Sequence, residues 1–129
     1  LTPSIALYEG RPTLAFGTPG GDQQDQWQLS FFLRYVHHKQ NLQAAIDMPL
    51  FHTAHFPGSF YPRTSQPGNV MIESSIGAET LKALKAMGHD ITEADPWSVG
   101  RLTAARRDAS GLLRAAATPR LMQAYAIGR

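Results

Sequence analysis

The turn from Gly17 to Asp22, with the sequence Gly-Thr-Pro-Gly-Gly-Asp, contains the residues best suited to chemistry. A strand-like run enters this turn and a helical pattern leaves it, so unpartnered backbone N–H groups gather at the positive end of a helix. Such a helix end binds anions. The adjacent glycines Gly20 and Gly21 allow positive φ and a close approach to a ligand. Two converging N–H groups would suit the oxyanion of a tetrahedral acyl-transfer intermediate.

The same residues also allow a simpler interpretation. In it the segment is only a tight turn, Asp22 caps the following helix, and Asp25 three residues later resembles the end of a capping box. Taken alone, the residues favour this second interpretation. The turn lacks the Gly-Lys-Ser/Thr of a phosphate-binding loop and the spacing of a dinucleotide fingerprint, so neither ATP nor NAD is indicated.

Histidines raise the question of a metal site. His52 and His55 are three residues apart and His37 and His38 are adjacent, but no third ligand stands at a recognisable spacing, so we predict no metal centre. We expect His52 and His55 to alternate between a packed and a solvated face of an extended segment, each with an ordinary hydrogen-bond partner.

A nucleophile is not visible in the chain. No serine lies in a Gly-x-Ser-x-Gly motif, and the absence of cysteine excludes a thiol nucleophile and disulfides within this chain while fitting either a reducing or an oxidising compartment. Several carboxylates could form catalytic pairs, but their spacing does not distinguish them from solvated surface, which is how we interpret them. They are Glu73, Glu79, Asp90, Glu93 and Asp95.

The elements that position the turn are predicted by hydrophobic periodicity. Ile5–Tyr8 and Thr13–Phe16 form a β-hairpin around a Gly/Pro turn. A helix from about Gln24 to Lys39 is apolar around much of its circumference, which predicts a buried helix. Asn41 caps a second short helix, which ends at Pro49.

The second half of the chain is predicted to contain a long loop, three further strands or strand pairs and one helix. Residues 51–68, rich in proline, glycine and aromatic residues, form a long ordered excursion lying against the body. The elements expected after it are a strand at Val70–Glu73, a helix at Ala78–Met87 stopped by Gly88, a strand beginning at Ile91, and a hairpin of Val99–Arg106 with Leu112–Ala117.

Composition sets the broad limits. The 129 residues, 43% hydrophobic and 17% charged, can bury one core and form one compact domain or part of one. We expect further sequence upstream of Leu1, and see neither a membrane-spanning run nor a signal peptide. The stretch from Trp97 onward is rich in arginine, but its arginines neither share a helical face nor alternate with aromatic residues. A solvated strand pair is therefore favoured over a nucleic-acid surface.

Several segments, in order along the chain, resemble the gamma-glutamyltransferase (gamma-glutamyl transpeptidase) family. Thr18-Pro19-Gly20-Gly21 resembles its Ser-Pro-Gly-Gly turn. The other matches are Leu1-Thr2-Pro3 with Met-Ser-Pro, Asn41–Ile46 with Asn-Val-x-Glu-Ala, Phe51-His52 with Arg-Phe-His, Thr80–Leu84 and Gly88-His89 with a helix ending in Lys-Gly-His, and Ala116–Arg120 with Ala-Ser-Asp-Pro-Arg.

The resemblance implies an N-terminal-nucleophile hydrolase of the α+β class, with a four-layer αββα sandwich. Residues 1–129 would be the C-terminal portion of a single catalytic domain in a zymogen that cleaves itself to expose a threonine upstream of Leu1. That threonine would attack a gamma-glutamyl amide, such as that of glutathione, with its own α-amino group as base, before water or an amino acid takes the acyl group. No metal or organic cofactor is implied.

Gly20 and Gly21 match the family's glycine pair, whose backbone N–H groups form the oxyanion hole. By the same resemblance, the residues that bind the substrate's α-carboxylate and α-amino groups lie upstream of Leu1. The expected partners are the remainder of the precursor and a small gamma-glutamyl substrate, with no nucleic acid and no membrane span in this segment. Alone, the chain is expected to be inactive and poorly stable, since its strands would have unpaired edges.

The chain departs from the family pattern at two places. Asp22–Asp25 replaces the usual Ser-Arg-Ile after the glycine pair, and Leu50 replaces a frequent arginine. A carboxylate here would oppose a developing oxyanion unless it turned away to cap the helix. Two alternatives stay open: a related acylase acting on another side-chain amide, such as a glutaryl group, and a binding homologue that lacks the nucleophile and uses its basic C-terminal third to contact an anionic partner.

Overall fold

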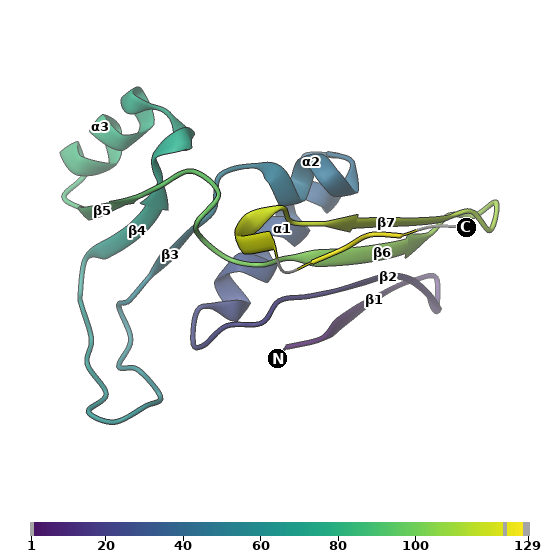
Figure 1. Ribbon diagram of the computed structural model, residues 1–129, viewed down its shortest axis with the longest axis horizontal. Coiled ribbons are helices and arrows are strands. Elements are labelled where there is room, and N and C mark those ends of the chain that lie inside the picture. The colour runs from purple at the N-terminus through teal and green to yellow at the C-terminus, as the bar shows by residue number, and fades with distance from the viewer. Residues whose placement is uncertain (1, 123, 128–129) are drawn as a thin grey trace.

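The computed structural model of the chain describes residues 2–122 and 124–127 (Figure 1). Leu1 and Arg129, which belong to the expected N-terminal motif and to the basic stretch, lie outside the described residues. In chain order the elements are β1 (Ser4–Tyr8), β2 (Arg11–Gly17), α1 (Gln24–Val36), α2 (Leu42–Asp47), β3 (Phe51–Thr53), β4 (Asn69–Glu73), η1 (Ser74–Ile76), α3 (Ala78–Ala86), β5 (Asp90–Ala94), β6 (Thr103–Arg107), β7 (Leu113–Ala117) and η2 (Arg120–Met122).

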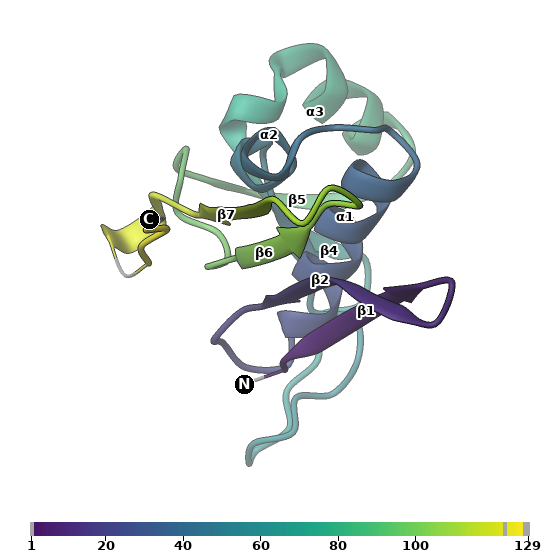
Figure 2. The same cartoon turned by 90° about the vertical axis from the view of Figure 1, so that its right-hand side faces the viewer.

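The strands form two sheets. An antiparallel sheet has the order β1-β2-β6-β7, and a smaller sheet has the order β3-β4-β5, with β4 and β5 parallel and joined through α3. Helices α1 and α2 lie on one face of the larger sheet (Figures 1 and 2). Between them lies the core, whose fully buried apolar side chains include Phe31, Ile46, Leu50 and Leu102. No helix within residues 2–122 and 124–127 is both long and apolar enough to cross a membrane.

Most predicted elements are confirmed, with shifted boundaries. Both hairpins form, and the Asn41 side chain caps α2 by accepting a hydrogen bond from the Ala44 N–H at 2.8 Å. Gly88 follows α3 with a φ of +92°, a left-handed conformation that suits glycine at a helix end. Helix α1 ends at Val36 rather than Lys39, and β6 begins at Thr103 rather than at residue 99.

Two expectations about packing are wrong in part. Helix α1 buries Trp27 and Phe31, but Leu29 and Leu33 on its other side are 58% and 40% exposed, so the helix is not buried all round in this chain. The excursion that follows β3 does not lie flat against the body. It extends away from the two sheets (Figure 1), and its aromatic side chains Phe56, Phe60 and Tyr61 are largely exposed.

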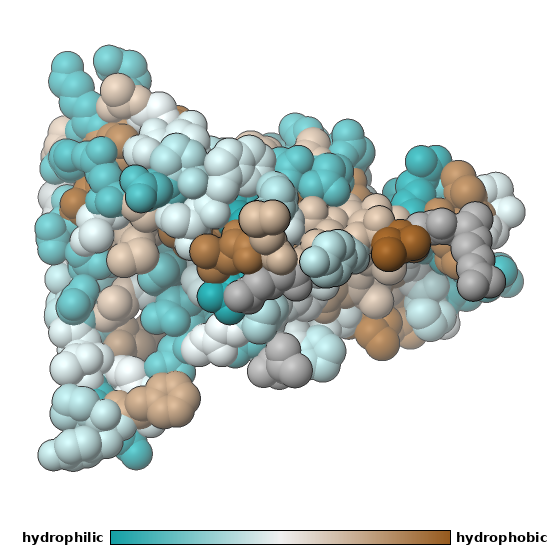
Figure 3. Space-filling view, viewed as in Figure 1, coloured by the Kyte–Doolittle hydropathy of each residue, from teal (hydrophilic) through white to brown (hydrophobic). Residues whose placement is uncertain are grey.

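The outer face of the larger sheet is apolar and made of small side chains. Ile5, Ala15, Ala105 and Ala115 stand opposite one another across its four strands. Apolar side chains gather over this sheet and the C-terminal segment in Figure 3, whereas the end formed by α3 is mostly hydrophilic. These side chains line a hollow of about 720 Å³, which Ala126 and Ile127 of the C-terminal segment border.

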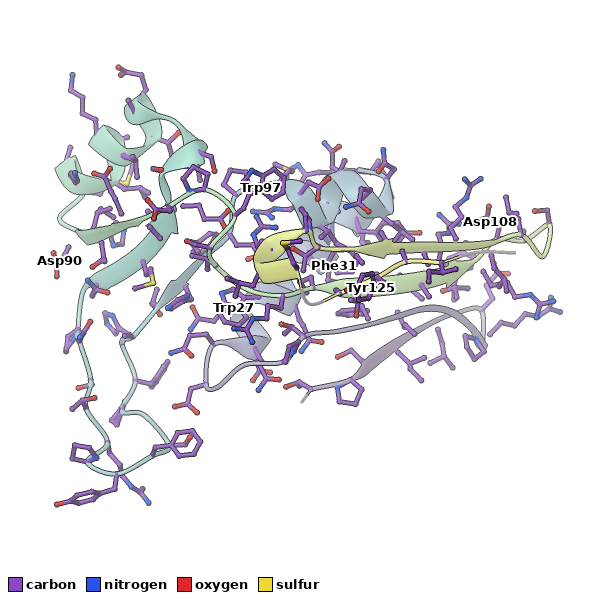
Figure 4. The ribbon with its side chains drawn as sticks, in the orientation of Figure 1. Trp27, Phe31, Asp90, Trp97, Asp108 and Tyr125 are labelled. Carbon is purple, nitrogen blue, oxygen red and sulfur yellow. The ribbon has the colours of Figure 1, made fainter. Side chains whose placement is uncertain are left out.

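A buried ion pair joins the two sheets. The Arg120 guanidinium, after β7, faces the Glu73 carboxylate at the end of β4 at 2.7 Å, and both residues are 1% exposed. The expectation that Glu73 and the C-terminal arginines are solvated is therefore wrong for these two. Arg120 also stacks on the ring of Trp97, 5.0 Å from its centroid (Figure 4).

The polar atoms of this pair are satisfied by backbone groups. Glu73 accepts hydrogen bonds from the N–H groups of Leu50 and Val99, and Arg120 donates to the carbonyls of Ile46 and Met48. Burial opposes ionisation of Glu73, but Arg120 and the two amides outweigh it and hold its pKa below the usual value. A lowered pKa in the folded state means that this stabilisation is complete above the unfolded pKa and is lost as the pH falls through the folded one.

The Arg120→Met substitution tests the ion pair. It leaves a buried carboxylate without its cation, so we expect the free energy of unfolding of the full-length protein to fall by about 3–5 kcal/mol in denaturant titrations. The control is Arg114→Met, which removes a surface pair with Asp108 and should cost less than about 1 kcal/mol. Equal losses in the two variants would contradict a dominant role for the buried pair.

Candidate oxyanion site

The glycine turn lies between the end of β2 and the start of α1. Gly20 has a φ of +147°, which disfavours any side chain, and a Cβ added there would come within 2.7 Å of the Trp27 ring. Gly21 is different, because an added Cβ would meet only the Gln23 side chain, at 3.6 Å. The two site residues predicted from the sequence therefore tolerate a side chain differently. Position 20 requires glycine because of its φ angle and its packing against Trp27, and position 21 does not.

The carbonyl groups of the turn are occupied from within the chain. The Gln24 side-chain amide donates to the carbonyls of Gly20 and Gly21, at 2.8 and 3.0 Å, and the Thr18 hydroxyl donates to the Pro19 carbonyl at 2.7 Å. By contrast, among the described residues no acceptor is bonded to the N–H groups of Gly20 and Gly21. This arrangement leaves two adjacent donors for a ligand just before a helix N-terminus.

Trp27 forms the base on which the turn rests. Its ring is packed between Gly20 and Gly100, where an added Cβ would lie 3.2 Å from the ring (Figure 4). The indole N–H donates to the Nδ1 atom of His52 at 3.3 Å, which places the proton of a neutral His52 on Nε2. Burial lowers the pKa of His52, which favours this neutral, accepting form.

His52 and His55 lie on a packed and a solvated face of the extended segment, as predicted. His52 is half-buried against Trp27, whereas His55 is exposed and accepts a hydrogen bond from the Gly68 N–H at 3.0 Å. His37 and His38 are exposed just beyond α1. Within the part of the chain that the structure describes, no three His, Asp or Glu side chains gather as metal ligands would.

Asp22 does not cap α1, contrary to the prediction. The N-cap residue is Gln23, whose side chain makes no capping bond. Instead the Asp22 carboxylate accepts two hydrogen bonds from Ser59, one from its hydroxyl and one from its N–H at 2.7 Å. These two bonds hold the pKa of Asp22 below its usual value, so the side chain is anionic near neutral pH. The excursion is thereby tied to the glycine turn.

A small cavity of about 220 Å³ lies between the turn and the excursion. Its lining includes Asp22, Gln23 and Gln26 on one side and Phe56 and Thr64 on the other. The residues that sequence reasoning missed are those that join distant segments: Trp27, Gln24 and Ser59. Of these three, only Trp27 had a signal in the sequence. A large ring packed against the turn requires a glycine at the contact, and Gly20 is that glycine.

Comparison with known proteins shows the family to which the chain belongs. The chain matches the family described as Gamma-glutamyltranspeptidase over residues 1–128, and it belongs to that family. It is similar to the solved structure of LmbA2991HD, with 53% identity and a TM-score of 0.92 over 98% of this chain and 23% of that one. It is also 28% identical to the glutathione hydrolase-like YwrD proenzyme of Bacillus subtilis over 93% of this chain and 22% of the relative.

The expected fold class is confirmed by these likenesses. The cephalosporin acylase of Bacillus halodurans, an N-terminal-nucleophile hydrolase type of structure, matches 92% of this chain and 20% of its own length, with 25% identity and a TM-score of 0.77. The mixed helices and sheets seen here are thus part of the αββα fold of that class. The chain spans between a fifth and a quarter of the length of these three proteins.

The different tolerance of positions 20 and 21 for a side chain can be measured as a change in the free energy of unfolding. Gly20→Ala places a methyl group against Trp27 at a strained φ, so we expect it to lower the free energy of unfolding by about 1–3 kcal/mol in the full-length protein. Gly21→Ala meets no close atom and should change stability by less than about 0.5 kcal/mol. Urea titration of both variants is the measurement, and a stable Gly20→Ala would refute the packing argument.

The Asp22–Ser59 contact predicts protease sensitivity. Asp22→Ala removes both bonds to Ser59, so the excursion should open more often and trypsin should cleave after the exposed Arg63 several times faster than in the parent protein. Asp25→Ala, an equally conservative loss of an exposed carboxylate on α1, is the control. If both variants are cut at the parental rate, the contact does not hold the excursion.

Proposed function

We propose that the full-length protein catalyses acyl transfer from a gamma-glutamyl amide, such as glutathione, to water or an amino acid. Family membership supports this reaction class, and the chain contributes one part of the site. The nucleophile in this proposal is a threonine upstream of Leu1, exposed by self-cleavage of a precursor, with its own α-amino group as base. Residues 1–129 are the C-terminal portion of that catalytic domain.

The observation that carries the proposal is the pair of unoccupied amides at Gly20 and Gly21. When the nucleophile adds to the amide carbonyl, negative charge develops on the oxygen. Two N–H groups that are already fixed and have no acceptor among the described residues can bind that oxygen without reorganisation. The chemistry requires no metal or organic cofactor, since the charge is stabilised by backbone dipoles.

The apolar outer face of the larger sheet supports the partner in this proposal, the remainder of the precursor. An αββα sandwich packs two sheets face to face, and the row of Ile5, Ala15, Ala105 and Ala115 offers the apolar side chains that such packing buries. Leu113, 73% exposed on the same sheet, would be covered in the same way. The isolated chain is accordingly expected to be inactive and poorly stable.

A related side-chain amide acylase is the second candidate. It is favoured by the likeness to cephalosporin acylase and by Asp22–Asp25, which stands in place of the Ser-Arg-Ile expected beside the glycine pair. A gamma-glutamyl and a glutaryl group differ by the α-amino group of the former. Turnover of a glutaryl anilide faster than of the gamma-glutamyl anilide would favour the acylase.

Deleting a single donor tests the proposed oxyanion hole. Gly21→Pro removes one N–H group, so we expect turnover of a chromogenic gamma-glutamyl anilide by the full-length protein to fall about 10²–10³-fold. Gly21→Ala keeps the N–H group and should retain most of the activity. The comparison is valid if both variants show parental thermal unfolding and self-cleavage.

Unchanged turnover in a folded Gly21→Pro variant would reject the oxyanion assignment. A parent protein that neither cleaves itself nor turns over either anilide would indicate instead a binding homologue without a nucleophile.

A further inference from the structure

We infer that Gln24, held in place by Thr2, is a positioning residue that aims the Gly21 N–H donor of the glycine turn. This inference rests on the proposed function of Gly20 and Gly21 as oxyanion donors. The proposed function assigns a role to these N–H groups, and the inference adds which side chains hold them in a fixed direction. Both residues lie outside the Thr18–Gly21 motif that resembles the family turn.

The argument starts from the geometry of a peptide unit. A trans peptide is planar, so its C=O and N–H bonds point in opposite directions, and fixing one fixes the other. The peptide bonds of the glycine turn are trans. Hydrogen bonds to the carbonyls of Pro19 and Gly20 therefore determine where the N–H groups of Gly20 and Gly21 point.

Gln24 performs this task for Gly21. Its Nε2 donates to the Gly20 carbonyl at 2.8 Å and to the Gly21 carbonyl at 3.0 Å. The Gly20 carbonyl is thereby drawn toward α1, and the N–H group of the same peptide, that of Gly21, points away from the helix. The Thr18 hydroxyl does the same for Gly20 by donating to the Pro19 carbonyl at 2.7 Å.

Thr2 holds the side chain of Gln24 in place. Its hydroxyl donates to the Gln24 Oε1 at 2.9 Å, while the Gln24 nitrogen faces the two carbonyls. A flipped amide would place its oxygen against two carbonyl oxygens, which is repulsive, so the carbonyls select the amide orientation and the Thr2 hydroxyl adapts to it by donating. The chain of contacts from Thr2 through Gln24 to the Gly20–Gly21 peptide therefore has one favourable arrangement.

A matched control exists one helical turn further along. Gln28 accepts a hydrogen bond from the Ser4 hydroxyl at 2.8 Å, just as Gln24 does from Thr2. The two glutamines thus make the same contact between α1 and the N-terminal segment. Gln28 differs in having no bond to the glycine turn. Substituting each by methionine, which preserves length and volume, separates the positioning of the turn from the packing of α1.

The experiment measures kcat and KM for the full-length protein on a gamma-glutamyl anilide. Gln24→Met should lower kcat about 10-fold to 10²-fold, less than full removal of a donor, and leave KM within about 2-fold, because the donors act on the transition state. Gln28→Met should keep the parental kcat. Thr2→Val should lower kcat less than Gln24→Met, and the double variant should be no worse than Gln24→Met alone.

Parental kcat in Gln24→Met, or equal losses in the two methionine variants, would overturn the inference while leaving the proposed function intact. Unchanged turnover in Gly21→Pro would reject the proposed function itself. A crystal structure of Gln24→Met gives a readout that does not depend on turnover. The Gly20–Gly21 peptide should rotate in it, and an unmoved peptide would also overturn the inference.

Discussion

The buried ion pair between Glu73 and Arg120 is the constraint on which the rest of the structure depends. It connects the end of β4 in the smaller sheet with the segment after β7 in the larger one, across 47 positions of sequence. Removing two charges from water is unfavourable, and the pair is tolerated because backbone groups complete its hydrogen bonding. Two of those groups, the N–H groups of Leu50 and Val99, begin the segments that line the core beneath the glycine turn.

From these two segments a continuous series of contacts leads to the candidate site. Leu50 packs against Gly100, Gly100 against Trp27, and Trp27 against Gly20. His52, two residues after Leu50, fixes the rotation of the same indole ring through its Nδ1 atom. The position of the turn is thus set by residues from three separate parts of the chain. A closely packed interior transmits such constraints because it has little free volume in which to relax.

Local sequence signals predicted the local structure well, and failed where a partner lies far away in the chain. The cap at Asn41 and the stop at Gly88 need only their neighbours, and both were predicted. Asp22 has every feature of a helix cap, but its carboxylate is bound by Ser59, 37 positions later. Glu73 was predicted to be solvated for the same reason. The burial of this carboxylate depends on Arg120, which lies far away in the sequence. The glycine pair could be assigned a role only through a family resemblance.

The departure from the family pattern after the glycine pair has a consistent physical explanation. Two of the polar replacements have a partner close to the turn: Asp22 binds the excursion, and Gln24 binds the carbonyls of Gly20 and Gly21. An anionic Asp22 beside an oxyanion would be unfavourable, but its two bonds from Ser59 satisfy the charge on the side of the excursion. An apolar residue at position 24 could only pack, whereas glutamine can also orient the backbone. The turn therefore depends on hydrogen bonds made by these two polar side chains.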